Sequence, residues 1–257
     1  QLEDTLESDV MYYYGEIRVE VIQLFRNFIE KLTEREGRKK RISILLTTPG
    51  GSAEAVEKMV EIIRHHYDEV YFIVPDMAMS AGTIFCMSGD KIYMDYSSSL
   101  GPIDPQVPDK ENQFLVPALG YLDKIQELIE KSRNNTITPA EFQLLAKQDL
   151  AMLRLYEQAK DLSKALLKSW LVQYKFKDWT RHRTNNIGTA VTVQEKEKRA
   201  EDIAEKLSNN KEWHSHGRMI GMKTLRDKLC LIIDDLSLDK KLHSAVRNYS
   251  DTLTGYL

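Results

Sequence analysis

Ser80 is the residue of this 257-residue chain whose sequence context best suits a nucleophile. It follows an apolar segment and a turn, and it precedes residues 81–87, which are small at first and apolar afterwards. This pattern predicts a helix that begins at Ala81. The first amides of a helix lack intrahelical partners and carry a partial positive field, which a developing oxyanion can use. The pattern therefore indicates acyl transfer through a serine, although a serine at this place can also simply cap its helix.

Gly50 and Gly51 form a second backbone element that could approach the same reacting group. Neither residue has a Cβ, so a substrate carbonyl could come close to their amides. An ordinary tight turn is the alternative explanation for the pair. Its position favours the chemical explanation, because the pair follows an apolar run just as Ser80 does.

Three short apolar runs, at residues 42–46, 70–74 and 91–94, would position these groups. They are rich in Ile, Val and Tyr and are bounded by Gly, Pro and Ser, which is typical of strands. They are apolar on both faces, which favours a buried parallel sheet.

A helix is predicted between the first two runs, because apolar residues there share one helical face. These residues are Val56, Met59, Val60 and Ile63. Strand, helix and strand form a right-handed crossover, and sites in such sheets lie beyond the carboxyl ends of the strands. We therefore expect Gly51, Ser80 and residues 100–106 to gather at one edge of the sheet.

Composition limits the classes of protein to which the chain can belong. Charged residues make up 29% of it and the formal net charge is −3, which favours a soluble protein and argues against a general nucleic-acid binder. Transmembrane runs and secretory signals are not visible, so a reducing, cytoplasmic compartment is expected. The two cysteines, Cys86 and Cys230, form no disulfide framework or metal-binding spacing, and no cofactor is expected.

The second half of the chain reads as mainly helical. Thr138 and Glu141 predict a capping box, and apolar residues recur from there to position 171. This long apolar helix is the expected contact of a homo-oligomer. Residues 177–192 are polar without a clear period, so we expect a domain of residues 1–176 and a helical C-terminal extension of residues 177–257 packing near the site.

The segments at residues 48–51, 79–83 and 100–106 resemble those of the serine dehydrogenase proteinase family. That family groups with the ClpP-like and signal-peptide-peptidase-A-like serine proteases. A Trp-His-Ser-His-Gly-Arg island at residues 213–218 is also similar to a family element. The resemblance implies an α/β, ClpP/crotonase-like fold of repeated ββα units with a helical C-terminal extension. It also implies hydrolysis of a peptide or an unfolded protein.

The resemblance further implies roles for individual residues. Ser80 would be the nucleophile, and the amides of Gly51 and Ala81 would form the oxyanion hole. An extended peptide would lie beside the sheet in the manner of an added strand. The residues expected to contact this peptide are Gly50, Leu100, Gly101 and Asp104.

The general base is left open by the sequence, because no histidine occurs between His66 and His182. Lys124 is the favoured candidate, by similarity to signal-peptide-peptidase-A-like enzymes, and would form a Ser-Lys dyad with Ser80; this role requires burial by neighbours such as Leu122 and Ile125. Lys110, in an exposed loop, is a weaker substitute.

A histidine from the C-terminal segment is the other candidate for the base. His216 or His214 could be oriented by Asp104, and this would give a Ser-His-acid triad, which is recognised by geometry and not by chain order. A structural role for these two histidines is the alternative.

Two other functions remain possible on the sequence alone. A crotonase-type acyl-CoA enzyme uses paired backbone amides on the same fold, although no cluster that would bind the CoA phosphates is evident. A non-catalytic oligomeric scaffold is the third possibility. The sequence contains no visible pyridoxal-phosphate lysine motif and no visible glycine-rich phosphate loop, so nothing in it supports a dehydratase.

Overall fold

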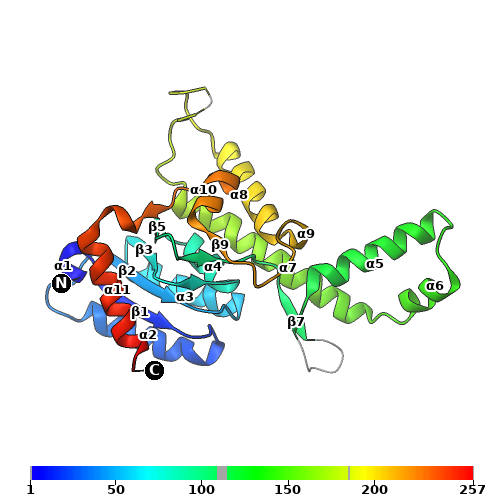
Figure 1. The fold of residues 1–257 in the computed structure, drawn as a ribbon, viewed down its shortest axis with the longest axis horizontal. Helices are drawn as coiled ribbons and strands as arrows, with labels where there is room; N and C mark the ends of the chain where they lie inside the picture. The colour runs from blue at the N-terminus through cyan, green and yellow to red at the C-terminus, as the bar shows by residue number, and fades with distance from the viewer. Residues whose placement is uncertain (1, 109–114, 185, 257) are drawn as a thin grey trace.

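A five-stranded parallel sheet forms the centre of the computed structural model, which describes residues 2–108, 115–184 and 186–256 (Figure 1). The strand order is β1-β2-β3-β5-β10 and all neighbours run parallel. The strands are β1 (Asp9–Tyr14), β2 (Arg41–Thr47), β3 (Glu69–Val74), β5 (Lys91–Met94) and β10 (Asp234–Asp235). The buried parallel strands expected at residues 42–46, 70–74 and 91–94 are therefore confirmed.

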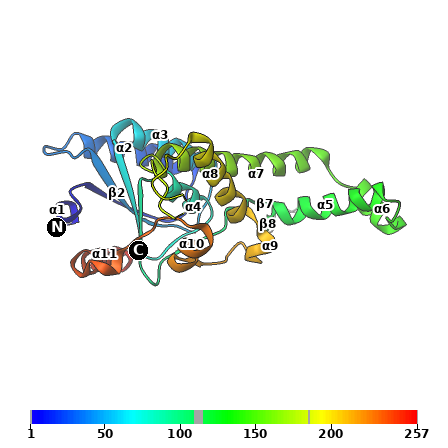
Figure 2. The same ribbon diagram turned by 90° about the horizontal axis from the view of Figure 1, so that it is seen from above.

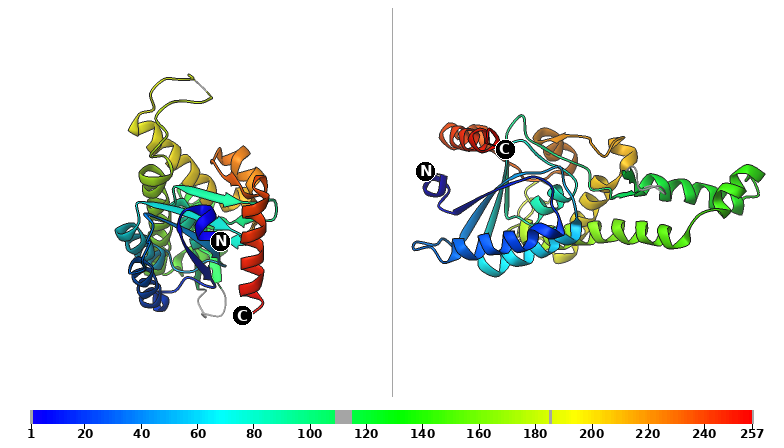
Figure 3. Two further views of the ribbon diagram at one scale, coloured as in Figure 1. Left: turned by 90° about the vertical axis from the view of Figure 1, so that its left-hand side faces the viewer. Right: turned by 90° about the horizontal axis from the view of Figure 1, so that it is seen from below.

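Helices cover both faces of this sheet. The helices α2 (Ile22–Thr33), α3 (Ala53–His66) and α4 (Ala81–Met87) pack against Ile42, Ile44 and Leu46 on one face. The opposite face carries Leu45 and Ile73, which pack against α1 (Leu2–Leu6) and α11 (Lys240–Thr254). Figures 2 and 3 show α11 on the side of the sheet opposite to α2 and α3. Alternate residues of β2 thus serve two apolar layers, because side chains of a strand point to opposite faces.

A second, small sheet lies beyond the carboxyl ends of the main strands. It consists of β4 (Met77–Ala78), β6 (Ser99–Leu100) and β9 (Ile220–Gly221), with β6 in the middle. The β4–β6 pair is parallel and the β6–β9 pair is antiparallel. An isolated bridge between Thr48 and Ala78 joins the end of β2 to this sheet. The small sheet therefore brings the chain near position 220 beside the turn that contains Ser80.

A helical arm extends from the body (Figures 1 and 2). It contains α5 (Ala118–Arg133), α6 (Pro139–Ala146) and the first half of α7 (Leu150–Trp170). Thr138 and Glu141 form the predicted capping box at the start of α6. The strands β7 (Gln106–Pro108) and β8 (Leu115–Pro117) pair at the base of the arm. Residues 109–114 between these two strands, which include Lys110, lie outside the described residues.

The C-terminal third shares the core of the sheet. Its elements are the π-helical turn η2 (Leu171–Lys175), α8 (Val193–Ser208), α9 (Asn210–Trp213), α10 (Met222–Leu229) and the 3-10 turn η3 (Leu236–Leu238). Ile203, Leu207 and Leu225 are fully buried in the same apolar cluster as β2 and α4. The division into residues 1–176 and 177–257 stays a prediction. Within the described ranges, none of the helices has the length and apolar character needed to cross a bilayer.

Candidate active site

Ser80 occupies a sharp corner between β4 and α4. Its φ of 51° and ψ of −116° lie outside the regions that ordinary L-residues favour. The carbonyl oxygen of Ser80 accepts hydrogen bonds from the amides of Thr83 (2.9 Å) and Ile84 (3.2 Å), which hold this conformation in place. Strain of this kind persists where surrounding contacts fix the backbone, and it concentrates at functional sites. The Ser80 hydroxyl has no hydrogen-bond partner among the described residues, so it is available to a substrate.

Gly50 lies directly against the Ser80 corner. A Cβ at Gly50 would stand 2.8 Å from the Met79 carbonyl oxygen and 2.9 Å from the Ser80 Cβ, and its φ is +110°. Gly51 has a φ of +139°, and a Cβ there would collide with the Ile17 carbonyl oxygen at 2.0 Å. Two independent reasons, backbone conformation and close approach, therefore require glycine at both positions.

The amides of Gly51 and Ala81 are the free donors of this corner. Ile17 donates to the Gly50 carbonyl oxygen (2.8 Å) and accepts from the Ser52 amide (2.9 Å), so it pairs with the diglycine segment on one side. Within the described part of the chain, neither the Gly51 amide nor the Ala81 amide has an acceptor, and Ala81 is the first residue of α4. Free amides at a helix start and in a glycine turn can bind an oxyanion.

Leu100 and Gly101 pack against the residues that form the Ser80 corner. Leu100 is fully buried in β6, where it pairs with Ala78 on one side and Ile220 on the other. The Gly101 amide donates to the Thr83 Oγ1 (2.9 Å), and a Cβ at Gly101 would lie 3.2 Å from the Ser80 nitrogen. Both edges of β6 are thus occupied at Leu100, which gives this residue a structural role in the described chain. Ile103, Pro105 and Gln106, which follow, line the cavity beside Ser80.

His216, which lines the Ser80 cavity, forms a hydrogen-bonded pair with Asp104. The His216 Nδ1 lies 3.0 Å from the Asp104 Oδ1, and only 1% of the Asp104 side chain is exposed against 23% of His216. Asp104 is held by its neighbour Ile103, whose amide donates to the Leu207 carbonyl oxygen at the end of α8 (3.0 Å). An imidazole that donates from Nδ1 to a carboxylate presents Nε2 as a proton acceptor. One cavity of about 730 Å³ is lined by both Ser80 and His216.

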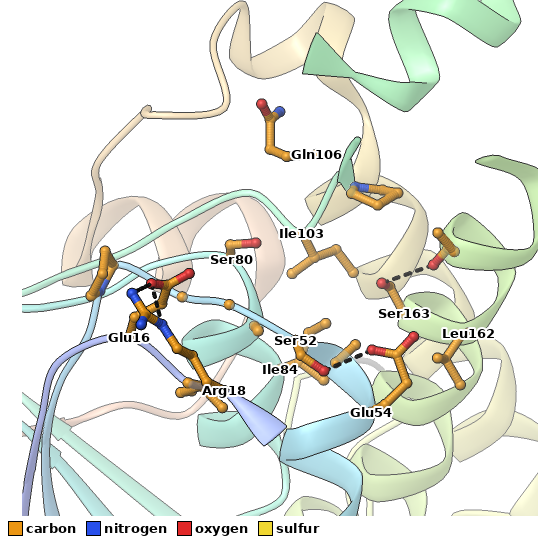
Figure 4. Close-up of a pocket in the computed structure, with 18 of the residues that line it drawn as sticks. Glu16, Arg18, Ser52, Glu54, Ser80, Ile84, Ile103, Gln106, Leu162 and Ser163 are labelled. Carbon is orange, nitrogen blue, oxygen red and sulfur yellow. Dashed lines mark hydrogen bonds and ion pairs between the residues drawn. The ribbon is translucent and has the colours of Figure 1, made fainter. Parts of the chain in front are cut away.

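Glu16 and Arg18 lie on one side of Ser80 in this cavity, and Ile103, Leu162 and Glu54 lie on the other (Figure 4). Glu16 and Arg18 pair with each other near Ser80. Glu54 accepts from the Ser52 hydroxyl (2.8 Å), beside Leu162. Sequence reasoning missed Glu16 and Arg18, because the bridge that places Ile17 beside Gly51 joins distant segments and leaves no local signal.

Lys124 lies outside the Ser80 cavity. It lines a different surface cleft on α5, 61% of its side chain is exposed, and its ammonium group pairs with Glu127 (2.9 Å). The expected burial by apolar neighbours is therefore not observed, because α5 belongs to the arm and not to the body. His214 lines the same cleft as Lys124, and Lys110 lies outside the described residues. Of the candidate bases that the structure describes, it brings His216 to the cavity that contains Ser80.

The described parts of the chain offer no evident set of ligands for a metal ion. No group of three or more His, Cys, Asp or Glu side chains there is arranged to hold one. The arrangement beside Ser80 instead combines a hydroxyl, an imidazole, a buried carboxylate and two free amides. These are the groups that nucleophilic acyl transfer requires.

Comparison with curated proteins finds relatives that are longer than this chain. The uncharacterized proteins MJ0137 and MJ1495 of Methanocaldococcus jannaschii are 31% and 30% identical over 147 and 120 residues. The matches cover 52% and 47% of this chain, and 49% and 39% of the relatives. The chain thus spans about half the length or less of the curated relatives it matches.

Solved structures show which fold the chain resembles, and a family model shows to which family it belongs. A mutant of the 1510-N membrane-bound stomatin-specific protease superposes with a TM-score of 0.51 at 16% identity, over 88% of this chain and 78% of that chain. This likeness concerns the fold alone, and it agrees with the α/β, ClpP/crotonase-like architecture expected from the sequence. The model of the ClpP-like SDH-type serine proteinases matches residues 34–168, just over half of the chain, with Ser80 and Asp104 inside the match. The chain belongs to this family of ClpP-like SDH-type serine proteinases.

Proposed function

We propose that the chain is a serine peptidase that works through an acyl-enzyme on Ser80, with His216 as general base and Asp104 as its orienting acid. The observation that carries the proposal is the Asp104–His216 hydrogen bond of 3.0 Å, together with the cavity that both His216 and Ser80 line. Membership of a serine proteinase family supports the same activity. Lys124 is the second candidate for the base, and its exposed position on the arm makes it the less favoured one.

The proposed reaction begins with transfer of the Ser80 hydroxyl proton to the His216 Nε2 as the Ser80 Oγ attacks the peptide carbonyl carbon. The carbonyl π electrons move to its oxygen, and the amides of Gly51 and Ala81 stabilise this oxyanion. When the tetrahedral intermediate collapses, the C–N bond breaks and His216 gives its proton to the leaving amine. Water, deprotonated by His216, then hydrolyses the ester and restores the Ser80 hydroxyl.

The free hydroxyl of Ser80 must approach the His216 ring for the first step. The structure contains no hydrogen bond between these two side chains, and both line the same cavity. Catalytic hydrogen bonds are often long in the absence of substrate and shorten in the complex to about 2.6–3.2 Å. Substrate that fills the cavity would displace water and bring the two groups together.

We further propose that the substrate is an extended peptide lying between the diglycine turn and residues 103–106. Gly50 and Gly51 line one side of the cavity, and Ile103, Pro105 and Gln106 line another. Leu100 would not pair with this peptide itself, because both of its backbone edges are already paired. It would contribute by holding the Ser80 corner in place. Asp104 contributes through His216, because it does not itself line the cavity.

A fluorophosphonate probe tests the proposed function directly. It should label the wild-type chain, and Ser80→Ala should remove the labelling. His216→Gln should slow labelling at least a hundredfold, while Lys124→Met should leave it within twofold. Loss of labelling in Lys124→Met alone would assign the base to Lys124 instead. Labelling that survives Ser80→Ala would remove Ser80 as the nucleophile.

The two other functions give different outcomes with the same protein. Thermal stabilisation by acyl-CoA esters, in a chain that the probe does not label, would favour a crotonase-type enzyme. Full biological function of Ser80→Ala would favour a scaffold. Neither function uses the hydrogen-bonded Asp104–His216 pair, which is why the peptidase is preferred.

We also propose a homo-oligomer assembled through the arm. The arm exposes large apolar side chains with few packing partners of their own: Phe142, Leu144, Leu150 and Leu155. Burial of such residues between subunits would contribute about 25 cal/mol per Å². Mass photometry should show a multimer for the wild type and smaller species for Phe142→Glu with Leu144→Glu. A wild type that is strictly monomeric at micromolar concentration would contradict the proposal.

A further inference from the structure

The cavity beside Ser80 carries more negative than positive charge. Its charged lining residues are Glu16, Arg18, Glu20 and Glu54. Arg18 is already matched, because both its Nε and its Nη2 donate to the Glu16 carboxylate. Neither Glu20 nor Glu54 forms an ion pair with a residue that the structure describes. A peptide that enters the cavity therefore meets carboxylates without a cationic partner, and no free ammonium or guanidinium group among the described lining residues.

Glu54 is held at this cavity by the start of α3. The Ser52 hydroxyl oxygen caps the helix by accepting from the Ala55 amide (2.9 Å), and its proton goes to the Glu54 Oε2 (2.8 Å). The other carboxylate oxygen, Oε1, has no partner within the described ranges. A glutamate in the first turn also stabilises its helix through the macrodipole, but that role leaves Oε1 free. One oxygen of Glu54 is therefore available to a ligand.

Apolar side chains lie between the Ser80 hydroxyl and the Glu54 carboxylate. Figure 4 shows the hydroxyl pointing toward Ile103, and Leu162 beside Glu54. Ala159 of α7 lines the same cavity, and its methyl group leaves room for a long side chain. Methylene groups buried against this wall would contribute about 25 cal/mol per Å². The space beside Ser80 thus suits a side chain that is apolar along its length and cationic at its end.

The substrate residue that enters this space is the one whose carbonyl Ser80 attacks. In the proposed acyl-enzyme, the carbonyl carbon of that residue is bonded to the Ser80 Oγ, so its Cβ is only a few bonds away. Its side chain therefore begins beside the hydroxyl, on the side where Ile103, Leu162 and Glu54 lie. Lysine and arginine fit this side best, because their methylene groups can cover apolar surface while the cationic group stays at a polar partner.

We propose that Glu54 is a specificity-determining residue that selects lysine or arginine on the N-terminal side of the scissile bond. The methylene groups of that side chain would lie against Ile103 and Leu162, and its cationic group would donate to the Glu54 Oε1. A charge-assisted hydrogen bond in a cavity filled by substrate is stronger than an ion pair on the open surface. The inference rests on the proposed function, because it names the substrate class of that site.

A matched pair of peptidyl phosphonates tests the selection. One carries lysine next to the reactive phosphorus and the other norleucine, which keeps the carbon chain and lacks the ammonium group. The wild type should react at least tenfold faster with the lysine compound. Glu54→Gln should remove this preference and leave the rate with the norleucine compound within twofold. Equal rates of the wild type with both compounds would overturn the inference, as would a preference that survives Glu54→Gln.

Glu57→Gln is the matched control, because Glu57 is exposed on the same helix and does not line the cavity. It should keep the preference of the wild type. Glu54→Lys should reverse the preference, so that a glutamate phosphonate reacts faster than the lysine compound. A folded Glu54→Lys variant that still prefers lysine would contradict the role of Glu54. Melting temperatures show whether each variant folds, and Glu54→Ala repeats the comparison if the glutamine variant unfolds.

Binding to Ser80→Ala separates this inference from the proposed function, because it needs no catalysis. In isothermal titration calorimetry, a short peptide with a central lysine should bind at least fivefold more tightly than its norleucine counterpart. The difference should disappear when Glu54→Gln is added to Ser80→Ala. A wild type that the fluorophosphonate probe does not label would contradict the peptidase, while calorimetry would still decide the selection. A labelled wild type with equal affinities for the two peptides would support the peptidase and overturn the selection.

Discussion

The His216 Nδ1 lies 3.0 Å from the Asp104 Oδ1, although 112 positions of sequence separate the two residues. Asp104 is almost completely buried, so its charge acts on the imidazole with little screening by water. Two contacts bring the segments together: the hydrogen bond from Ile103 to Leu207 at the end of α8, and the pairing of Leu100 with Ile220. The C-terminal third of the chain therefore supplies one residue of the proposed site, whose other residues lie in the first half.

Asp104→Asn should slow acylation by the fluorophosphonate probe about 10³- to 10⁴-fold, the scale seen when the orienting acid of a triad is replaced. An asparagine side chain retains the shape and loses the charge that holds the imidazole proton on Nδ1. The measurement is the limiting acylation rate, taken with a melting curve that shows a folded variant.

Asp123→Asn serves as the matched control for that experiment. Asp123 is an exposed carboxylate on α5 that pairs with Lys211 (3.0 Å), away from Ser80. Its replacement should change the acylation rate less than twofold. A folded Asp104→Asn variant with the wild-type rate would remove Asp104 from the proposed triad.

Elements with strong local signals could be predicted from the sequence. The buried strands follow from continuous apolar runs, and the start of α4 at Ala81 follows from small residues after Ser80. The capping box depends on Thr138 and Glu141, which are three positions apart in the sequence. In each case the physical cause acts within a few residues, so a single sequence contains it.

The sequence named both Lys124 and His216 as candidates for the base but could not decide between them, because the position of each depends on packing between distant segments. The apolar neighbours of Lys124 suggest burial, yet α5 leaves the body and exposes that lysine. His216 reaches the site through the two-residue strand β9, which is too short to leave a pattern of its own. The pairing of Ile17 with the diglycine turn also depends on contact alone.

Gly50→Ala should destabilise the fold and disturb the site at once. The φ of +110° strains any residue with a Cβ, at a cost of about 1–3 kcal/mol, and the added methyl would meet the Met79 carbonyl and the Ser80 Cβ. We expect a fall of more than about 2 kcal/mol in the free energy of unfolding and at least a tenfold loss of acylation.

Gly188→Ala is the control for the Gly50 variant. Gly188 also has a positive φ, +86°, but a Cβ there would meet nothing within 4 Å. It should show the backbone strain alone and keep the wild-type acylation rate. Urea unfolding and probe kinetics measure the two effects. Equal losses at both positions would show that close contact at the Ser80 corner is unimportant.

Asp95 should make the docking of α11 sensitive to acid. Burial raises the pKa of this carboxyl, but hydrogen bonds from His243, Ser97 and Arg247 outweigh burial and hold the pKa well below its usual range. A lowered pKa in the folded state contributes stability above the unfolded pKa of 3.8, and this contribution is lost as the pH falls below that value.

The measurement for Asp95 is the free energy of unfolding between pH 7 and pH 3 for the wild type and Asp95→Asn. The variant should be less stable at pH 7, and its stability should fall less steeply with acid. Hydrogen exchange should show loss of protection first in α11, which carries His243 and Arg247. Parallel pH curves for the two proteins would contradict this account of the docking.

Lys175 should make stability rise with pH at the alkaline side as well. Burial lowers the pKa of its ammonium group to about 8, with Asp234 and Asp90 opposing the shift. Between about pH 8 and the unfolded pKa of 10.5, the unfolded chain binds more protons than the folded chain. The contribution of Lys175 to stability therefore rises with pH across this window, and below it the charged, half-buried lysine destabilises the fold.

Lys175→Met should remove that penalty, because methionine fills similar space without a charge. We expect a gain of about 1–3 kcal/mol at pH 7 and a flatter dependence between pH 8 and 10.5 than in the wild type. Urea unfolding at each pH provides the comparison, and the exposed Lys147→Met should change neither quantity. If Lys175→Met retains the pH slope of the wild type, another group causes it, because a methionine at this position has no proton to release.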